Sequence, residues 1–261
     1  MYALKALKFL LGIVIAFSLC GGNADAYNES ERINWFYKTV SENTRPDILG
    51  GNLPEGIENA LYIGKEGSKT VYLTFDAGYS NENVESILDT LKKNNIKAAF
   101  FILPGIIKNS PETVMRMADE GHLVCNHTTT HCDVSKLTDI EDFKRELRIV
   151  EEKYFELTGK QMEKYFRPPE GAFSEKTLSF CKTLGYTPVF WSFAYADWDN
   201  ARQMPPEKAK EKVLSQIHDG MVLLLHPTSA TNAKILDEII CELRTQGYSF
   251  GTLDELESEL R

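Results

Sequence analysis

Val71-Tyr-Leu-Thr-Phe-Asp-Ala-Gly-Tyr79 is an apolar run that ends abruptly in a carboxylate followed by glycine. Its apolar, β-branched and aromatic residues predict a buried strand, and the aspartate followed by a glycine predicts a turn where that strand ends. Four later segments repeat the design, because each is an apolar run that leads to a polar side chain capable of chemistry. The side chains at these strand ends are Asp76, His127 with His131, Arg167, Asp197 and His226.

Strand-like and helix-like segments alternate from Thr70 to the end of the chain. Apolar runs predict strands at 71–75, 98–102, 122–125, 165–166, 186–191, 221–225 and 248–250. Amphipathic spacing predicts helices at 82–94, 111–120, 139–158, 175–184, 206–218 and 232–246, with Asn81 or Ser80, Ser110 and Thr138 among the capping residues. About seven strands thus alternate with about six helices, which indicates an α/β fold whose parallel sheet closes, or nearly closes, into a barrel.

Three segments divide the chain. Residues 1–26 combine Lys5 and Lys8 with an apolar run at 9–19 and a small-residue site, which predicts an exported protein whose signal peptide is cleaved after Ala26. An uncleaved N-terminal anchor is the alternative, and a lipoprotein attached through Cys20 fits less well. Residues 27–69 predict an irregular lead-in with a short helix around 34–40, and residues 70–261 predict one catalytic domain.

Composition excludes some classes of function. The net charge of −9 disfavours nucleic acid as a partner, because such binding needs a basic face. No feature points to a protein partner. The cysteines that remain after the predicted cleavage lack a CxxC pair, and a domain of this size does not need disulfides, so we expect buried free thiols at Cys125, Cys132, Cys181 and Cys241.

The histidine pair is the candidate metal site. In a βα barrel the active site lies at the carboxyl ends of the strands. His127-Thr-Thr-Thr-His131 has the spacing that puts two imidazoles on one face of a helical turn, where both reach one metal ion. Two surface or capping histidines are the alternative interpretation of this short pattern.

The other strand-end residues have both a catalytic and a structural interpretation. Asp76 is either a general base or a turn cap, and Arg167 either orients a carboxylate bidentately or forms a plain ion pair. His226 is either a core histidine or a general acid that protonates a leaving amine while Asp197 stabilises its protonated form. Trp198 either walls a small apolar pocket or belongs to the core.

Five ordered motifs carry a resemblance to a known family. Between about Thr70 and Phe250 the chain resembles the polysaccharide deacetylases of carbohydrate esterase family 4. The motifs are Thr74-Phe-Asp-Ala-Gly78, His127-Thr-Thr-Thr-His131, Arg167-Pro-Pro-Glu-Gly171, Asp197-Trp198 and Leu225-His226. Within that family, Phe-Asp-x-Gly-Tyr, Arg-Pro-Pro-x-Gly and Val189 to Ser192 are similar to the exported N-acetylmuramic acid deacetylases of spore-forming bacteria.

The resemblance implies a fold and a set of roles. The fold is a distorted (β/α)7 barrel of the polysaccharide deacetylase type. The implied roles are a base at Asp76, metal ligands at His127 and His131, a base-orienting Arg167, an acid-tuning Asp197 and an acid at His226, and we expect Tyr79, Trp198 and Leu225 to contact the substrate. The implied partner is the glycan strand of peptidoglycan, on the cell wall or spore envelope side of the membrane.

Ala77 departs from the family pattern, which usually has a second aspartate there as a metal ligand. A methyl group cannot coordinate a cation, so the implied divalent ion should be held weakly. If Asp76 completes the ligand set itself, its service as base is in doubt. Two imidazoles favour zinc, with cobalt and nickel as alternatives.

Three functions remain open at this level. The first is metal-assisted de-N-acetylation of N-acetylmuramic acid for muramic δ-lactam formation in spore cortex. The second is deacetylation of N-acetylglucosamine in peptidoglycan or chitin-like glycans. The third is a glycan-binding protein with a degraded metal site and no turnover.

Overall fold

A parallel sheet of eight strands forms the centre of the molecule in the computed structural model, which describes residues 28–261. Seven strands follow the order β10 (Phe193–Ala194), β11 (Met221–Leu225), β4 (Thr70–Ala77), β5 (Ala99–Ile102), β6 (Leu123–Asn126), β7 (Tyr165–Phe166) and β9 (Thr187–Pro188). The eighth, β12 (Ser249–Gly251), pairs with the first part of β4, and β5 pairs with its last part. The apolar run that starts at Val71 therefore lies in the central strand.

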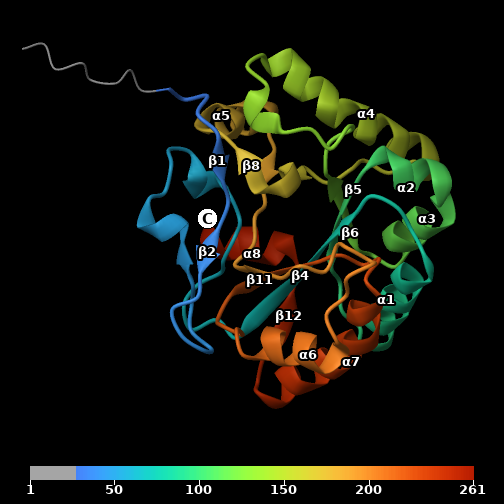
Figure 1. Cartoon of the computed structure of the whole chain (residues 1–261). Helices are drawn as coiled ribbons and strands as arrows, with labels where there is room; N and C mark the ends of the chain where they lie inside the picture. Colours follow the sequence, from blue (N-terminus) through green and yellow to red (C-terminus); the bar gives the residue numbers. More distant parts are fainter. Residues whose placement is uncertain (1–27) are drawn as a thin grey trace, which may run out of the picture.

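Within residues 28–261, eight α-helices surround the strands (Figure 1). They are α1 (Glu82–Lys93), α2 (Pro104–Asn109), α3 (Pro111–Asp119), α4 (Ile140–Thr158), α5 (Glu175–Leu184), α6 (Pro206–Leu214), α7 (Ala230–Thr245) and α8 (Leu253–Leu260). The α/β fold and its (β/α)7 barrel type are confirmed. β11 has the predicted bounds and is buried along its whole length, as a strand covered on both faces must be.

Local signals explain the helices that were predicted best. Asn81 caps α1 by accepting a hydrogen bond from the backbone N–H of Asn83. Ser174 and Thr177 form a capping box at the start of α5, and Gly185 ends that helix with a left-handed φ of 71°. The bounds of α5 therefore coincide with the prediction.

Other local predictions were wrong. Ser110 makes no side-chain cap on α3, and Asp139, rather than Thr138, caps α4 by accepting from the backbone of Glu141. The helices α2 and α8 were missed, α6 ends four residues before the predicted 218, and the strand predicted at 186–191 shrinks to β9. Short elements such as α2 offer too few residues for a periodic signal, which is why sequence pattern misses them.

The lead-in completes the barrel. In the described sheet, the edge strands β9 and β10 do not pair with each other. Between them, Leu61 donates to the carbonyl of Pro188 and accepts from the N–H of Phe190, both at 2.8 Å, while the N–H of Gly64 donates to the carbonyl of Gly220 at 2.7 Å. The barrel is thus nearly closed, with backbone from the lead-in in its opening.

The earlier part of the lead-in forms two short antiparallel pairings and not the helix expected at 34–40. β1 (Ile33–Asn34) pairs antiparallel with β8 (Ala172–Phe173), and β2 (Tyr37–Lys38) pairs with β3 (Asp47–Ile48). Trp35 stacks on Phe190 with ring centroids 4.2 Å apart. Tertiary pairing and aromatic packing therefore override the weak helical pattern of this segment.

The cysteines and the N-terminus complete the comparison with the sequence. Cys125, Cys132, Cys181 and Cys241 are free thiols, as predicted, although Cys241 is exposed and only Cys125 and Cys181 are buried. Within residues 28–261, no helix is both long and apolar enough to cross a membrane. The predicted signal peptide and its cleavage after Ala26 lie outside the described residues.

Candidate active site

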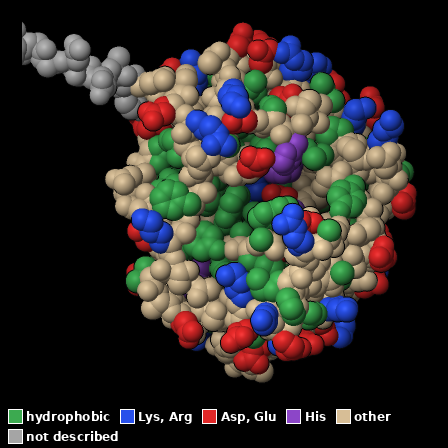
Figure 2. Space-filling view, viewed as in Figure 1, with side chains coloured by type: hydrophobic (Ala, Val, Ile, Leu, Met, Phe, Trp, Pro, Cys, Tyr) green, Lys and Arg blue, Asp and Glu red, His purple; other side chains and the backbone are tan. Residues whose placement is uncertain are grey.

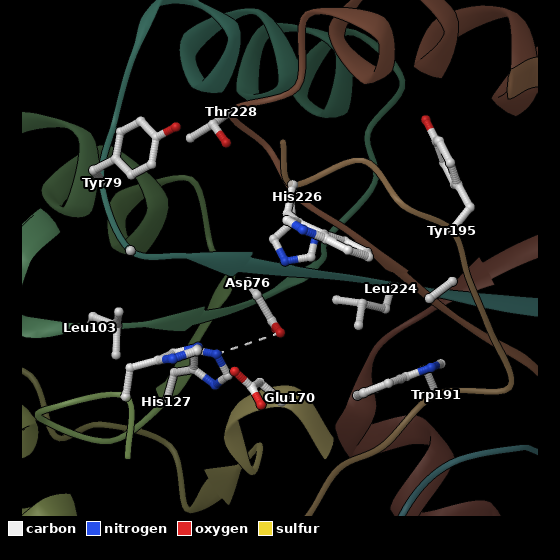
Figure 3. Close-up of a pocket in the computed structure, with 14 residues that line it drawn as sticks. Asp76, Tyr79, Leu103, His127, Glu170, Trp191, Tyr195, Leu224, His226 and Thr228 are labelled. Carbon is white, nitrogen blue, oxygen red and sulfur yellow. Dashed lines mark ion pairs between the residues drawn. The ribbon is translucent and has the colours of Figure 1, made fainter. Parts of the chain in front are cut away.

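A pocket of about 680 Å³ opens at the carboxyl ends of the central strands. In Figure 2 it is the hollow beside the histidine on the visible face, and Figure 3 shows its labelled side chains. Its lining consists of Asp76, Gly78, Tyr79, Leu103, His127, His131, Glu170, Trp191, Ala194, Tyr195, Trp198, Leu224, His226 and Thr228. The strand ends that the sequence singled out thus converge on one cavity.

Asp76 lies near the end of β4 and is paired with a buried arginine. Nη1 of Arg167 donates to Oδ1 of Asp76 over 2.7 Å, and the arginine side chain is fully buried. Nη2 of Arg167 donates instead to the hydroxyl of Thr74 at 2.8 Å, so the bidentate contact with Asp76 that the sequence suggested was wrong. A guanidinium fixed by several acceptors leaves the second carboxylate oxygen of Asp76 free to face the pocket.

The charge around Asp76 keeps it ionised. Burial is the largest single influence and raises the pKa of the carboxyl group. The charge and hydrogen bond of Arg167, together with the nearby His127 and His226, lower the pKa by more than burial raises it and leave it below its ordinary value. A carboxylate that stays ionised at neutral pH and faces a cavity is able to accept a proton from a neighbouring water.

On the opposite side of the pocket, Asp197 holds His226. Oδ1 of Asp197 accepts from Nδ1 of His226 at 2.7 Å, and Oδ2 accepts from the backbone N–H of His226 at 2.8 Å. Asn232 donates a further hydrogen bond to Oδ2 at 2.6 Å. The aspartate is 1% exposed, so its charge is screened little by solvent.

These contacts favour the protonated form of His226. Burial lowers the pKa of the imidazole, but the hydrogen bond and negative charge of Asp197, followed by the charge of Asp76, raise it above its ordinary value overall. With Nδ1 engaged by Asp197, Nε2 is the atom that can donate a proton into the pocket.

The histidine pair reaches the pocket without a helix. Residues 127–131 lie in an irregular segment after β6, where Thr128 and His131 have left-handed φ values of 70° and 56°, so the predicted helical turn was wrong. The two rings nevertheless lie close together, with centroids 5.1 Å apart and the planes inclined at 72° in an edge-on arrangement. The hydroxyl of Thr128, which accepts from the backbone N–H of His131 at 2.9 Å, stabilises this bend.

Two of the three residues expected to contact substrate line the pocket, and the third does not. Trp198 is 61% exposed and meets the His226 ring edge-on at 6.1 Å between centroids, and Tyr79 is half exposed and accepts from Asn200 at 2.7 Å. Leu225, predicted to contact substrate, lies in the hydrophobic core. Leu224 lines the pocket instead, because successive side chains of a strand point to opposite faces.

Sequence reasoning assigned no role to several residues of the site. Thr74 anchors Arg167, Asn232 anchors Asp197, and Glu170 and Trp191 line the cavity. The first lies inside a quoted motif on the same strand as Asp76, and period-two alternation places its side chain on the same face. Asn232 lies inside α7, seven residues after the end of β11, and no local pattern marks it.

Comparison with known proteins decides the family. The sequence profile of the polysaccharide deacetylases matches residues 63–189. The peptidoglycan-N-acetylmuramic acid deacetylase PdaA of Bacillus subtilis is 41% identical over 248 residues, which cover 93% of this chain and 94% of PdaA. This chain belongs to the polysaccharide deacetylases of carbohydrate esterase family 4. The solved structure of PdaA, a family 4 carbohydrate esterase, has a TM-score of 0.84 over 89% of this chain and 99% of that structure.

Two further similar proteins differ from PdaA in activity. The peptidoglycan-N-acetylglucosamine deacetylase PgdA of Listeria monocytogenes is 33% identical over 79% of this deacetylase and 43% of PgdA. A family 4 pseudoenzyme from Bacillus anthracis has a TM-score of 0.69 at 27% identity, over 76% of this chain and 68% of that structure. The chain is thus similar both to active deacetylases of two sugars and to an inactive member.

Family 4 deacetylases are metal-dependent, and the polar atoms of this pocket fit a cation. Nδ1 of His127 lies 2.9 Å from the carbonyl oxygen of Arg167 and must donate to it. Burial lowers the pKa of His127 to about 4, so the ring is neutral and Nε2 carries a lone pair. That lone pair faces Oδ2 of Asp76 at 3.6 Å, and two acceptors in this relation are stabilised by a cation between them.

The pocket offers fewer coordinating side chains than a metal site normally has. Within residues 28–261, no three histidine, cysteine, aspartate or glutamate side chains are arranged to hold one ion together. Ala77 is fully buried in the hydrophobic core and offers no ligand. His127 and His131 would therefore hold the ion, with Asp76 close to it.

Proposed function

We propose that this deacetylase removes the acetyl group from N-acetylmuramic acid in peptidoglycan strands, leaving the free amine from which muramic δ-lactam forms in spore cortex. The similarity to PdaA supports the choice of sugar, because it extends over almost all of both chains, whereas the similarity to PgdA covers less than half of that protein. Acetate is the second product.

The observation that carries this proposal is the placement of an arginine-paired carboxylate, Asp76, and an aspartate-paired imidazole, His226, on one pocket. In Figure 3, Asp76 and His226 both point into the cavity, one from β4 and the other from the end of β11. The lowered pKa of Asp76 keeps it ionised, as a proton acceptor must be, and the raised pKa of His226 favours the protonated form that a proton donor needs. A glycan-binding groove has no need of this pair.

The reaction follows from these positions. Asp76 accepts a proton from the water that attacks the acetyl carbon, and Arg167 keeps the carboxylate oriented for that transfer. His226 donates the proton at Nε2 to the sugar nitrogen as the carbon–nitrogen bond breaks, and Asp197 stabilises the imidazolium beforehand. A divalent cation held by His127 and His131 supplies Lewis-acid polarisation of the acetyl carbonyl.

The aromatic walls suit a sugar ring. Trp198 and Tyr79 are exposed aromatic side chains that line the pocket, and Trp191, which lines it too, is less exposed. Apolar faces of pyranose rings bury against such surfaces, while polar groups fix the orientation of the ligand. We assign Trp198 and Tyr79 to substrate binding on this basis.

Acetate release is the test of this function. The chain from Tyr27 onward would be incubated with peptide-free glycan strands, intact peptidoglycan and chito-oligosaccharides, with chelator or with added zinc, cobalt or nickel. Metal-dependent release from the peptide-free strands that disappears in Asp76→Asn is the expected result. Release only from chito-oligosaccharides would transfer the function to N-acetylglucosamine, and retained release in Asp76→Asn would remove Asp76 from the role of base.

A non-catalytic glycan-binding function is the second candidate, favoured by one observation. The methyl group of Ala77 is buried in the core and supplies no ligand, and a pseudoenzyme exists among the structural neighbours. Saturable glycan binding without acetate release under any of the three metals would establish it.

A further inference from the structure

We propose that Glu170 supplies a carboxylate ligand to the cation held by His127 and His131. The proposal deepens the metal-assisted function above and rests on it for the presence of the ion. Glu170 lies in the turn η4 (Pro169–Gly171) that directly follows the loop of Arg167, and it lines the pocket together with both histidines. In Figure 3 Glu170 is drawn beside His127 and below Asp76, and all three residues line the pocket.

The backbone of Glu170 is held in an unusual conformation. Its φ of 57° and ψ of 7° are left-handed, which costs a residue other than glycine about 1 kcal/mol. Such conformations persist where the surroundings fix them, and they gather at functional sites. The strain alone identifies no ligand, but it shows that the position of this side chain at the pocket is determined by the fold.

The neighbouring Gly171 explains how the turn is fixed. A Cβ atom at Gly171 would lie 2.8 Å from Cβ of Trp35 and 2.8 Å from the ring of Trp191, so no other residue fits without displacing the packing. The N–H of Trp35 donates to the carbonyl of Gly171 at 2.8 Å, and its indole N–H donates to the carbonyl of Trp191 at 2.8 Å. The lead-in thus clamps the turn, and only the side-chain bonds of Glu170 remain free to rotate.

The carboxylate of Glu170 is free to bind. Among residues 28–261 it forms no hydrogen bond or ion pair, and the side chain is exposed. Asp76, in contrast, already accepts from Arg167 and is assigned to proton transfer. Glu170 is therefore the acid in this pocket that can coordinate a cation without being withdrawn from the chemistry.

Ligand chemistry and charge both favour the assignment. Two imidazoles and one carboxylate, with a fourth position open, form one of the usual ligand sets of catalytic zinc. The carboxylate of Asp76 is paired with Arg167, whereas the carboxylate of Glu170 has no cationic partner among residues 28–261 and adds an uncompensated negative charge to the lining. A divalent cation between the histidines and Glu170 neutralises that charge.

The described side chains do not yet form a three-ligand cluster, so the proposal includes a movement. A glutamate has three rotatable side-chain bonds, and the exposed position of Glu170 leaves them unhindered. Rotation brings the carboxylate to the ion that His127 and His131 hold, while the clamped backbone stays in place. Metal binding therefore orders this side chain without rearranging the fold.

Isothermal titration of the chain from Tyr27 onward with zinc and with cobalt tests the proposal without any glycan. Glu170→Gln keeps the shape of the side chain and removes the charge, and we expect it to weaken the metal Kd at least tenfold. Glu66→Gln, which removes the same charge from an exposed turn away from the pocket, is the matched control and should leave Kd unchanged. The visible absorption of bound cobalt should also change in Glu170→Gln alone.

Two results would overturn the assignment. An unchanged Kd and cobalt spectrum in Glu170→Gln would show that Glu170 is not a ligand, and a raised KM in the same variant would make it a sugar contact. A wild-type chain that binds neither metal would refute the site as a whole. Failure of the substrate assignment is distinguishable, because the acetate assay can fail for muramic strands while the metal titration still separates the two variants.

Discussion

Replacement of Asp197 by asparagine tests the acid side of the site. Oδ2 of Asp197 accepts from the backbone N–H of His226 and from Asn232, so an asparagine should place its oxygen there and turn its amide N–H₂ toward Nδ1 of His226. The imidazole then accepts at Nδ1, where it donates in the wild type. Asp197→Asn therefore removes both the charge and the hydrogen bond that favour the protonated ring.

The magnitude follows from these contacts. Loss of an adjacent opposite charge lowers an imidazole pKa by about 1–3 units, and each unit corresponds to about 1.4 kcal/mol. Because the pKa of His226 is raised in the wild type, activity that needs the protonated ring is present below that pKa and is lost as pH rises through it. The variant should shift this alkaline limb to lower pH and reduce kcat/KM by about 10²–10⁴-fold.

A pH profile of acetate release, with NMR titration of His226, measures both effects. Asp199→Asn is the matched control, because it removes an equal charge from the same loop, where Asp199 pairs with exposed Arg202. The control should keep the wild-type profile. Asp197→Asn with kcat/KM within about threefold of wild type and an unmoved alkaline limb would refute the role of His226 as acid.

Three further variants probe the base, the clamp and the aromatic wall. Arg167→Met should leave the carboxylate of Asp76 without its partner and lower the free energy of unfolding by about 3–5 kcal/mol, which urea unfolding measures. It should also move the acid limb of the kcat/KM pH profile to higher pH, because Arg167 lowers the pKa of Asp76. Gly171→Ala should cost about 2–4 kcal/mol in urea unfolding, because its Cβ meets two tryptophans; an unchanged midpoint would contradict the clamp. Trp198→Ala should raise KM about tenfold, a change of about 1.4 kcal/mol, with kcat nearly unchanged; a loss in kcat alone would speak against a binding role.

The sequence predicted the strands that carry the site because they are long, apolar and followed by conspicuous polar residues. β4 and β11 contain continuous buried runs, and the strand-end rule for βα barrels brings their last residues together. The prediction that His127 and His131 lie close together was confirmed, although the helical turn assumed for them was wrong. The four-residue spacing keeps the two histidines within a short distance of each other. The left-handed backbone of Thr128 and His131, which the spacing does not reveal, sets the actual course of the segment.

The remainder depends on contacts that no local pattern encodes. Side-chain alternation along β11 determines which of Leu224 and Leu225 faces the pocket, and a shift of one residue in the strand exchanges the two. The clamp of Trp35 on Gly171 joins segments more than 130 residues apart. Neither Asn232 behind Asp197 nor Glu170 beside the histidines follows from spacing, because only the tertiary fold brings them to the pocket.

We propose that Asp76 and His226 together remove acetyl from muramic residues. Mass spectrometry of peptide-free glycan strands, incubated with the metal-loaded chain and digested to disaccharides, identifies the sugar that loses acetyl. Loss of one acetyl group on the muramic residue is the expected result, with Asp76→Asn giving none. Acetyl loss confined to the glucosamine residue, or intact disaccharides with every metal, would contradict it.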